Sequence, residues 1–158
     1  MITETSEPVV QVKDGFVFLH CNCAKMMNVG VTKQFREIYP KIFDEYKEAL
    51  WAYESPGELI GKFKSVQLDK RLWACLCFAQ LNVAKFDFDT KPDAYEKIFR
   101  SVKRQLTAHI RKTFDDKWML HVDSRLGNEG GTSFDDDILP IVKTVFEFSD
   151  IPVVIHRS

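Results

Sequence analysis

The sequence predicts a three-layer α/β/α sandwich with a mixed, largely parallel central sheet. Strand-like apolar runs alternate with segments whose apolar residues recur at helical spacing through most of the 158 residues. The run from Leu72 to Phe78 is apolar throughout, which is typical of a strand covered on both faces. No internal repeat or low-complexity tract interrupts the alternation.

Composition favours one domain. With 45% hydrophobic residues and three Trp, the chain can bury one core, so we expect a single domain over 1–158 with its core at about 9–156. The 22 basic and 23 acidic residues nearly balance, and no overall field therefore attracts nucleic acid or a membrane. The N-terminus lacks a secretory signal and no apolar run approaches the roughly 20 residues that span a bilayer. We therefore expect a cytoplasmic location and no membrane partner.

The N-terminal region predicts a β-hairpin. Asp14-Gly15 lies between the apolar segments Val9–Val12 and Phe16–His20, and Asp-Gly suits the positive φ angles of a hairpin turn. The second of these strands leads directly into the segment Cys21–Gly30.

Two helices follow that segment. The first has Val31, Phe35 and Ile38 at helical spacing and is broken at Pro40. The second ends at 55–57. Its apolar stripe comprises Ile42, Phe43, Tyr46, Ala49, Leu50 and Tyr53.

The middle of the chain predicts a strand pair and the longest helix. Phe63–Leu68 and Leu72–Ala79 flank a short turn at 69–71, and the polar segment 80–91 is too irregular to be an element. Pro92 opens a helix with the apolar stripe Tyr95, Ile98, Phe99, Val102, Leu106 and Ile110. The basic residues off this stripe are Lys97, Arg100, Lys103 and Arg104. Because no aromatic platform interleaves with them, we interpret them as a solvated face and do not expect a nucleic-acid partner.

The C-terminal third predicts a strand at Trp118–Val122, a glycine-bearing loop, a helix and a final strand at Val153–Ile155. The helix carries Ile138, Ile141, Val142, Val145 and Phe146. Asp135, Asp136 and Asp137 stand at its start, and we expect Asp137 to be the N-cap, which would place Pro140 in the first turn.

The four cysteines form two C-x-C pairs, Cys21/Cys23 and Cys75/Cys77. Four thiolates could bind zinc, but structural zinc ligands usually have two to four residues between them and lie on turns. These pairs lie in apolar runs, so we expect buried thiols and no metal.

Two strand-to-helix loops are rich in small and polar residues: Cys21–Gly30 and Asp123–Phe134. Open α/β sheets bind ligands beyond the carboxyl ends of their strands, where exposed backbone N–H groups and helix dipoles favour anions. Facing one crevice, the two loops would suit a diphosphate or a sugar phosphate. The alternative is that both loops only connect a strand to a helix, and the glycines alone do not exclude this.

Two histidines end strands that lead into these loops. His20 precedes the first loop, and His121 precedes the second with Asp123 on the same face of its strand. Histidine suits general acid–base catalysis, so His20 and His121 are candidate catalytic residues. Alternatively, both are hydrogen-bonded core residues.

Several segments resemble the macro domain family. "FLHCNC" followed by "NVGVTKQFREIYPKIFDEYKE" resembles the family's first ligand loop and the helices after it, particularly in the branch of ADP-ribose 1''-phosphate phosphatases and terminal ADP-ribose protein glycohydrolases. "KPDAYEKIFRSVKRQL" resembles the long third helix, and "RLGNEGGTSFDDDILPIVKTVF" resembles the second loop and its helix. The resemblance implies binding of ADP-ribose or a related nucleotide between the two loops, without a cofactor.

The resemblance also implies site residues. Asn22 is similar to the loop Asn that contacts the distal ribose, and it is a further candidate catalytic residue. The first wall would comprise Met27, Asn28, Val29, Gly30 and Val31. The opposite wall would comprise Leu126, Gly127, Asn128, Glu129, Gly130, Gly131 and Thr132.

Departures from the family pattern leave two functions open. Lys25-Met26-Met27-Asn28 replaces most of the glycines that let backbone approach a diphosphate. No Lys occurs at Cys77–Gln80, where the glycohydrolase branch has one, and Thr132-Ser133 stand about where its catalytic Asp is expected. One interpretation is ADP-ribose binding with hydrolysis of ADP-ribose 1''-phosphate or ADP-ribosyl esters. The other is a degenerate module that binds a protein or nucleic acid.

Overall fold

The central feature is a six-stranded sheet. The computed structural model describes residues 1–158 except 25–26, 28–29, 81–91, 114–117 and 129–130. In this described part of the chain the strand order is β1-β6-β5-β2-β4-β3, and only β3 runs antiparallel to its neighbour. The strands are β1 (Ile2–Thr5), β2 (Gly15–Asn22), β3 (Phe63–Asp69), β4 (Leu72–Gln80), β5 (Leu120–Asp123) and β6 (Val153–His156).

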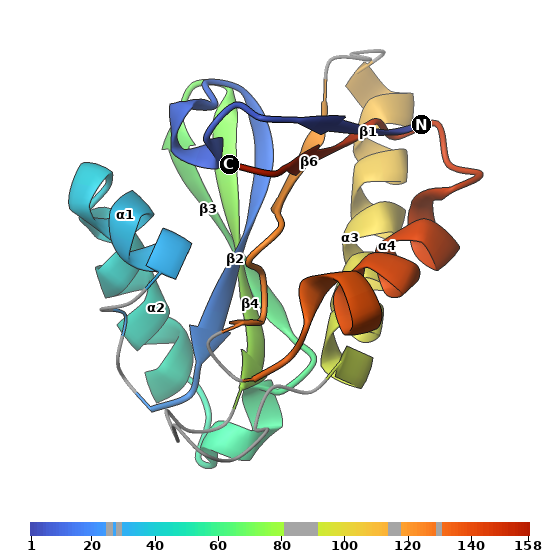
Figure 1. Cartoon of the computed structure of the whole chain (residues 1–158). Coiled ribbons are helices and arrows are strands. Elements are labelled where there is room, and N and C mark those ends of the chain that lie inside the picture. The colour runs from blue at the N-terminus through green and yellow to red at the C-terminus, as the bar shows by residue number, and fades with distance from the viewer. Residues whose placement is uncertain (25–26, 28–29, 81–91, 114–117, 129–130) are drawn as a thin grey trace.

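Helices cover both faces of this sheet (Figure 1). α1 (Gly30–Ile38) and α2 (Lys41–Trp51) pack on one face, and α3 (Pro92–Thr113) and α4 (Leu139–Phe146) pack on the other. Each face has its own cluster of buried apolar side chains. The short helices are η1 (Val9–Gln11), η2 (Pro56–Leu59) and the π-helix η4 (Phe134–Ile138), which runs into α4. The predicted three-layer α/β/α sandwich with a mixed, largely parallel sheet is confirmed.

The predicted N-terminal hairpin is wrong. Val9–Gln11 is the short helix η1, whose Val9 is buried on the α1 side of the sheet. Gly15 does have a positive φ of 98°, but the reason is close approach within the sheet: a Cβ there would lie 2.5 Å from the carbonyl oxygen of Met119. The first strand is instead β1, which pairs in parallel with β6 near the opposite end of the sequence.

Most of the other elements agree with the sequence pattern. The strand pair β3–β4 and the long helix from Pro92 are confirmed. α2 ends earlier than expected, at Trp51, and Ile38 at the end of α1 is 53% exposed.

The N-cap of η4, the π-helix that runs into α4, is Ser133, not Asp137. The Ser133 hydroxyl accepts from the Asp136 N–H, and the Asp137 carboxylate accepts from the Ser133 N–H. Because the π-helix precedes α4, the N-cap lies four residues before the predicted position.

The cysteines are packed into the core. All four thiols are buried. Burial raises the pKa of Cys75 to about 12 and that of Cys77 well above its ordinary value. In the described residues no group of three or more His, Cys, Asp or Glu side chains could hold a metal ion.

The same part of the chain contains no helix that is both long enough and apolar enough to cross a bilayer.

Candidate functional site

A narrow crevice of about 10 Å³ lies at the carboxyl ends of β2 and β5. It is lined by Phe18, Leu19 and His20 of β2, Val31 and Thr32 of α1, and Asp123, Arg125 and Leu126 at the end of β5. From β2 the chain continues into α1 on one face, whereas from β5 it leads to α4 on the other. Ligands of open α/β sheets bind at such a switch point. The second of the two loops singled out in the sequence therefore borders this crevice, whereas the first contributes no lining residue and is represented by the elements on either side of it, β2 and α1.

The first wall begins with a turn at Asn22. The Oδ1 atom of Asn22 accepts from the Ala24 N–H at 2.9 Å and from the Tyr46 hydroxyl at 2.9 Å. The same hydroxyl lies 2.8 Å from the Asn22 carbonyl oxygen. An Asn that accepts from the backbone two residues on stabilises a local turn, so Asn22 and Tyr46 together fasten the start of the loop to α2.

The N-terminus of α1 completes this wall. Gly30, its first residue, has a positive φ of 64°. The Thr32 hydroxyl donates to the carbonyl oxygen of His20 at 2.8 Å, which holds α1 against the end of β2. The unpaired N–H groups and dipole at a helix N-terminus favour anions. This end of α1 therefore presents an electropositive backbone to the crevice.

Met27 lies behind this wall. It is only 4% exposed and belongs to the apolar cluster beneath α1 and α2. Its carbonyl oxygen accepts from the Arg36 guanidinium at 3.2 Å. One of the bulky residues of the first loop is thus used for core packing.

The opposite wall is built on an ion pair whose carboxylate is buried. Asp123 is 2% exposed, and its two carboxylate oxygens accept from Nε and Nη2 of Arg125 at 2.7 and 2.9 Å. The Arg125 backbone N–H also donates to Oδ1 at 2.8 Å. Such a two-point contact fixes the plane of a guanidinium. Because 43% of the Arg125 side chain is exposed, a positioned cation lies at the rim of the crevice.

Successive turns carry the second loop away from Arg125. The Asn128 N–H donates to the Arg125 carbonyl oxygen, and the Gly131 N–H donates to that of Asn128, both at 3.0 Å. Gly127 and Gly131 have φ values of 88° and 82°, which glycine adopts without strain. Thr132 is buried where the loop joins η4.

Two of the three acidic residues at the start of η4 are engaged elsewhere. Asp135 contacts Arg157 at 2.8 Å, and this hydrogen-bonded cation lowers the pKa of the carboxyl group. Asp137 accepts from the Ser133 N–H.

His20 lies in the floor of the crevice within a hydrogen-bonded network. Its Nε2 lies 2.8 Å from Oε1 of Gln80, and its Nδ1 contacts the Tyr95 hydroxyl. An amide oxygen only accepts, so Nε2 carries the proton, and in the neutral ring Nδ1 accepts from Tyr95. Gln80 ends β4, the strand in which the glycohydrolase branch was expected to carry a Lys.

His121 points to different partners. Its Nδ1 lies 3.0 Å from Nε2 of His156, and its Nε2 lies 3.0 Å from the Asp14 carbonyl oxygen. Burial, followed by the neighbouring His156, lowers its pKa to about 4. His121 is not among the residues that line the crevice, although Asp123 is.

The structure brings part of the predicted site together. His20, Val31 and Leu126 line the crevice. The other described residues of the predicted site do not line it: Asn22, Met27, Gly30, Gly127, Asn128, Gly131 and Thr132. Asn28, Val29, Glu129 and Gly130 lie outside the described residues. Sequence reasoning did not assign Thr32 or Arg125 to the site. Two features of the sequence could have indicated them: Thr32 is a hydroxyl residue in the first turn of α1, and Arg125 is a cation two residues after the end of β5.

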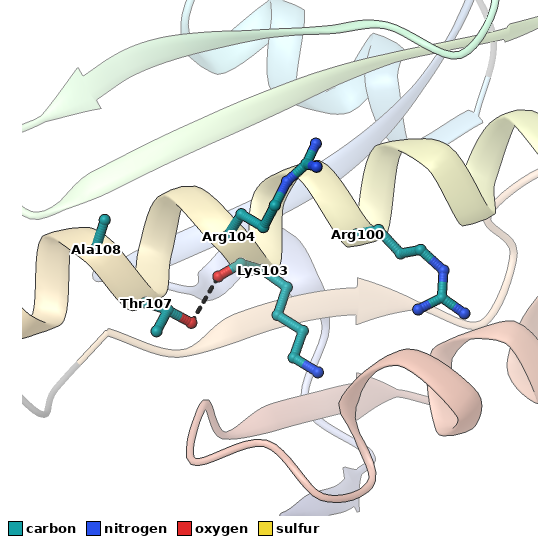
Figure 2. Close-up of a pocket in the computed structure, with 5 residues that line it drawn as sticks. All are labelled: Arg100, Lys103, Arg104, Thr107 and Ala108. Carbon is teal, nitrogen blue, oxygen red and sulfur yellow. Dashed lines mark hydrogen bonds between the residues drawn. The ribbon is translucent and has the colours of Figure 1, made fainter.

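The basic face of α3 is a separate feature (Figure 2). Arg100, Lys103, Arg104, Thr107 and Ala108 line an open groove of about 500 Å³. Arg100 pairs with Glu96 at 3.0 Å, and Lys103 donates to the Val145 carbonyl oxygen at 2.9 Å. These contacts are consistent with the solvated helix face expected from the sequence.

Comparisons with known proteins identify the fold. No protein-family model matches the sequence, and no curated protein matches it. Among solved structures, the macrodomain of Mycobacterium tuberculosis DarG is similar with a TM-score of 0.76, 21% identity and coverage of 100% of this chain and 98% of that one. A protein of unknown function from Bacteroides thetaiotaomicron has a TM-score of 0.81 at 16% identity, with 99% and 97% covered.

A third structure contains a ligand. Thermosipho africanus DarTG in complex with ADP-ribose matches with a TM-score of 0.68 and 17% identity over 90% of this chain and 38% of that one. Identities this low show a common fold. The chain therefore has the macrodomain fold that its loop and helix segments resemble.

Proposed function

We propose that the crevice binds ADP-ribose or a related ADP-ribosyl derivative. The observation that carries this proposal is the pairing of two hydrogen-bond donors across one crevice: the N-terminus of α1 on one wall and, on the other, the part-exposed Arg125 guanidinium that Asp123 holds in place. A diphosphate carries negative charge that both features would stabilise. The solved complex of Thermosipho africanus DarTG with ADP-ribose, which has the same fold, supports this choice of ligand.

Two observations bear on whether an anionic nucleotide fits this crevice. Of the four residues 25–28 that stand where the family has a glycine-rich loop, Met27 packs into the core, so its side chain does not fill the crevice. The other three lie outside the described residues. Asp135 and Asp137, which would repel a phosphate, are paired with Arg157 and the Ser133 backbone. The positions of Met27, Asp135 and Asp137 are therefore compatible with a site for an anionic nucleotide.

The enzymatic form of the proposal is hydrolysis of ADP-ribose 1''-phosphate or of an ADP-ribosyl ester in the same crevice. His20 is the candidate acid–base group, because it is the titratable ring in the floor of the crevice. Gln80 occupies the end of β4 and accepts from His20, so a lysine-dependent glycohydrolase mechanism is not part of the proposal. The alternative is a module of the same fold that binds a protein or nucleic acid and hydrolyses nothing.

Calorimetric titration with ADP-ribose, with AMP as the control ligand, tests binding. We expect a dissociation constant in the micromolar range, about −8 kcal/mol, and a tenfold or larger loss in Arg125→Gln. Arg104→Gln is the matched control, because that guanidinium lies in the separate groove on α3. No heat at millimolar ADP-ribose would reject the proposal and leave the partner-binding module.

Release of phosphate from ADP-ribose 1''-phosphate tests the enzymatic form. Turnover that is lost in His20→Gln while ADP-ribose still binds would support it. Binding without turnover would restrict the function to recognition.

A further inference from the structure

Two buried histidines on neighbouring strands form a hydrogen-bonded pair that the proposed function does not use. His121 lies in β5 and His156 ends β6, and both are less than 8% exposed. Nδ1 of His121 and Nε2 of His156 are 3.0 Å apart. The two outer ring nitrogens face backbone carbonyl oxygens: His121 Nε2 lies 3.0 Å from that of Asp14, and His156 Nδ1 lies 2.8 Å from that of Glu7.

The number of protons on the two rings follows from the carbonyl oxygens at either end of this row of three hydrogen bonds. A carbonyl oxygen can only accept, so both outer nitrogens must carry hydrogen. The two inner nitrogens need one further hydrogen between them, because two lone pairs or two N–H groups facing each other repel. Four nitrogens therefore carry three hydrogens. Two neutral imidazoles carry only two, so all three contacts form only when the pair holds one extra proton.

The pair joins the N-terminal segment to the sheet. Glu7 and Asp14 bracket the segment that contains η1, and each supplies a carbonyl oxygen to one histidine. Val9 and Val12 of this segment pack in the same buried cluster as Val31 and Phe35 of α1. The pair thus supports η1, and η1 supports the helix whose N-terminus forms one wall of the crevice.

The charged groups around the pair come from several elements. Asp14 favours a positive charge on His121, while burial and His156 oppose it. Asp123 lies opposite His156 in the β5–β6 register and is neutralised by Arg125. Glu4 and Arg157 pair with each other, and Arg157 also contacts Asp135. The remaining charged side chains on the segment and on α1 are Glu7, Lys13, Lys33, Arg36 and Glu37.

We propose that His121 and His156 share one extra proton and act as a pH-dependent clasp that fastens the Glu7–Asp14 segment beneath α1. With one proton fewer, the inner contact or one carbonyl contact is lost. With one proton more, the inner nitrogens repel each other. The clasp is therefore complete only within a window of pH.

Long-range ¹H–¹⁵N correlation spectra of the uniformly ¹⁵N-labelled full chain test the proton count between pH 3.5 and 8. We expect a pH range in which His121 Nε2 and His156 Nδ1 are both protonated and a scalar coupling joins the two inner nitrogens. The proposal would be overturned if both rings stayed neutral until they became protonated together, with no pH range in which the pair holds one extra proton.

Hydrogen exchange of the Gln11 and Val12 amides tests the clasp itself, because these N–H groups donate to Pro8 and Val9 within the fastened segment. Their protection factors should be highest in the same pH range and fall at least about threefold on either side. In His156→Gln, an amide N–H can donate to His121 Nδ1 without an extra proton, so the maximum should disappear. An unchanged pH profile in this variant would overturn the clasp, and if the variant does not fold, the wild-type spectra decide. Neither readout needs a ligand, so failure of nucleotide binding would leave this result standing.

Discussion

The guanidinium of Arg125 covers the carboxylate of Asp123 through two parallel hydrogen bonds, and only the arginine is substantially exposed. Arg125→Ala would leave a carboxylate that is 2% exposed without its cation. Because a buried charge that loses its partner is costly, we expect a loss of about 3 kcal/mol in the free energy of unfolding. Chemical denaturation measures this change.

Two further variants serve as controls for that experiment. Adding Asp123→Asn to Arg125→Ala should recover part of the loss, because the unpaired charge is removed. Arg100→Ala breaks an exposed pair with Glu96 on α3 and should cost less than about 1 kcal/mol. Equal effects of Arg125→Ala and Arg100→Ala would contradict the account of the second wall.

Tyr46→Phe tests how the first loop is fastened. The hydroxyl donates toward both the carbonyl oxygen and Oδ1 of Asn22, and its removal leaves these buried acceptors with one donor fewer. We expect a loss of about 1–2 kcal/mol in the free energy of unfolding and weaker ADP-ribose binding, measured by denaturation and calorimetry. Tyr39→Phe, on a half-buried ring at the end of α1, is the control. Unchanged affinity in Tyr46→Phe would show that the turn at Asn22 does not shape the crevice.

Gly15→Ala tests why a glycine stands at the start of β2. A Cβ there would lie 2.5 Å from the Met119 carbonyl oxygen, and the backbone has a φ of 98°. Steric overlap and backbone strain together should cost roughly 2–4 kcal/mol. Gly57→Ala is the matched control, since a Cβ at Gly57 would meet only the Ser55 hydroxyl at 3.8 Å. Thermal unfolding distinguishes the two, and equal stability of both variants would contradict the sheet contact.

The elements that were predicted correctly depend on local patterns. The strand pair β3–β4 has its turn between adjacent segments, and α3 has an opening Pro and a long apolar stripe. In contrast, β1 forms because Ile2 pairs with Val153 in β6, and no local pattern in four residues indicates a partner that distant. Assigning Gly15 to a turn was wrong for the same reason, because the group that requires a glycine is the distant Met119.

The candidate site likewise has a part that local sequence patterns predict and a part that only the folded structure shows. The position of both loops was predictable, because it follows from the alternation of strands and helices and from the rule that ligands bind at strand ends. The contacts that build the walls were not. Asn22 meets Tyr46, and His121 meets His156, across 24 and 35 residues, and only the folded sheet brings such pairs together.

The pH dependence of stability tests the environment of His121. Its pKa is lowered from 6.5 to about 4, so the unfolded chain takes up this proton at a higher pH than the folded protein does. The contribution of His121 is fully present above pH 6.5, decreases as the pH falls toward 4, and levels off below that value. Its total is about 3 kcal/mol in the free energy of unfolding, measured by urea denaturation at a series of pH values. In His121→Gln the decrease between pH 6.5 and 5, where few carboxyl groups titrate, should be smaller than in the wild type. Parallel curves for the two proteins in that interval would mean that His121 titrates normally in the folded state.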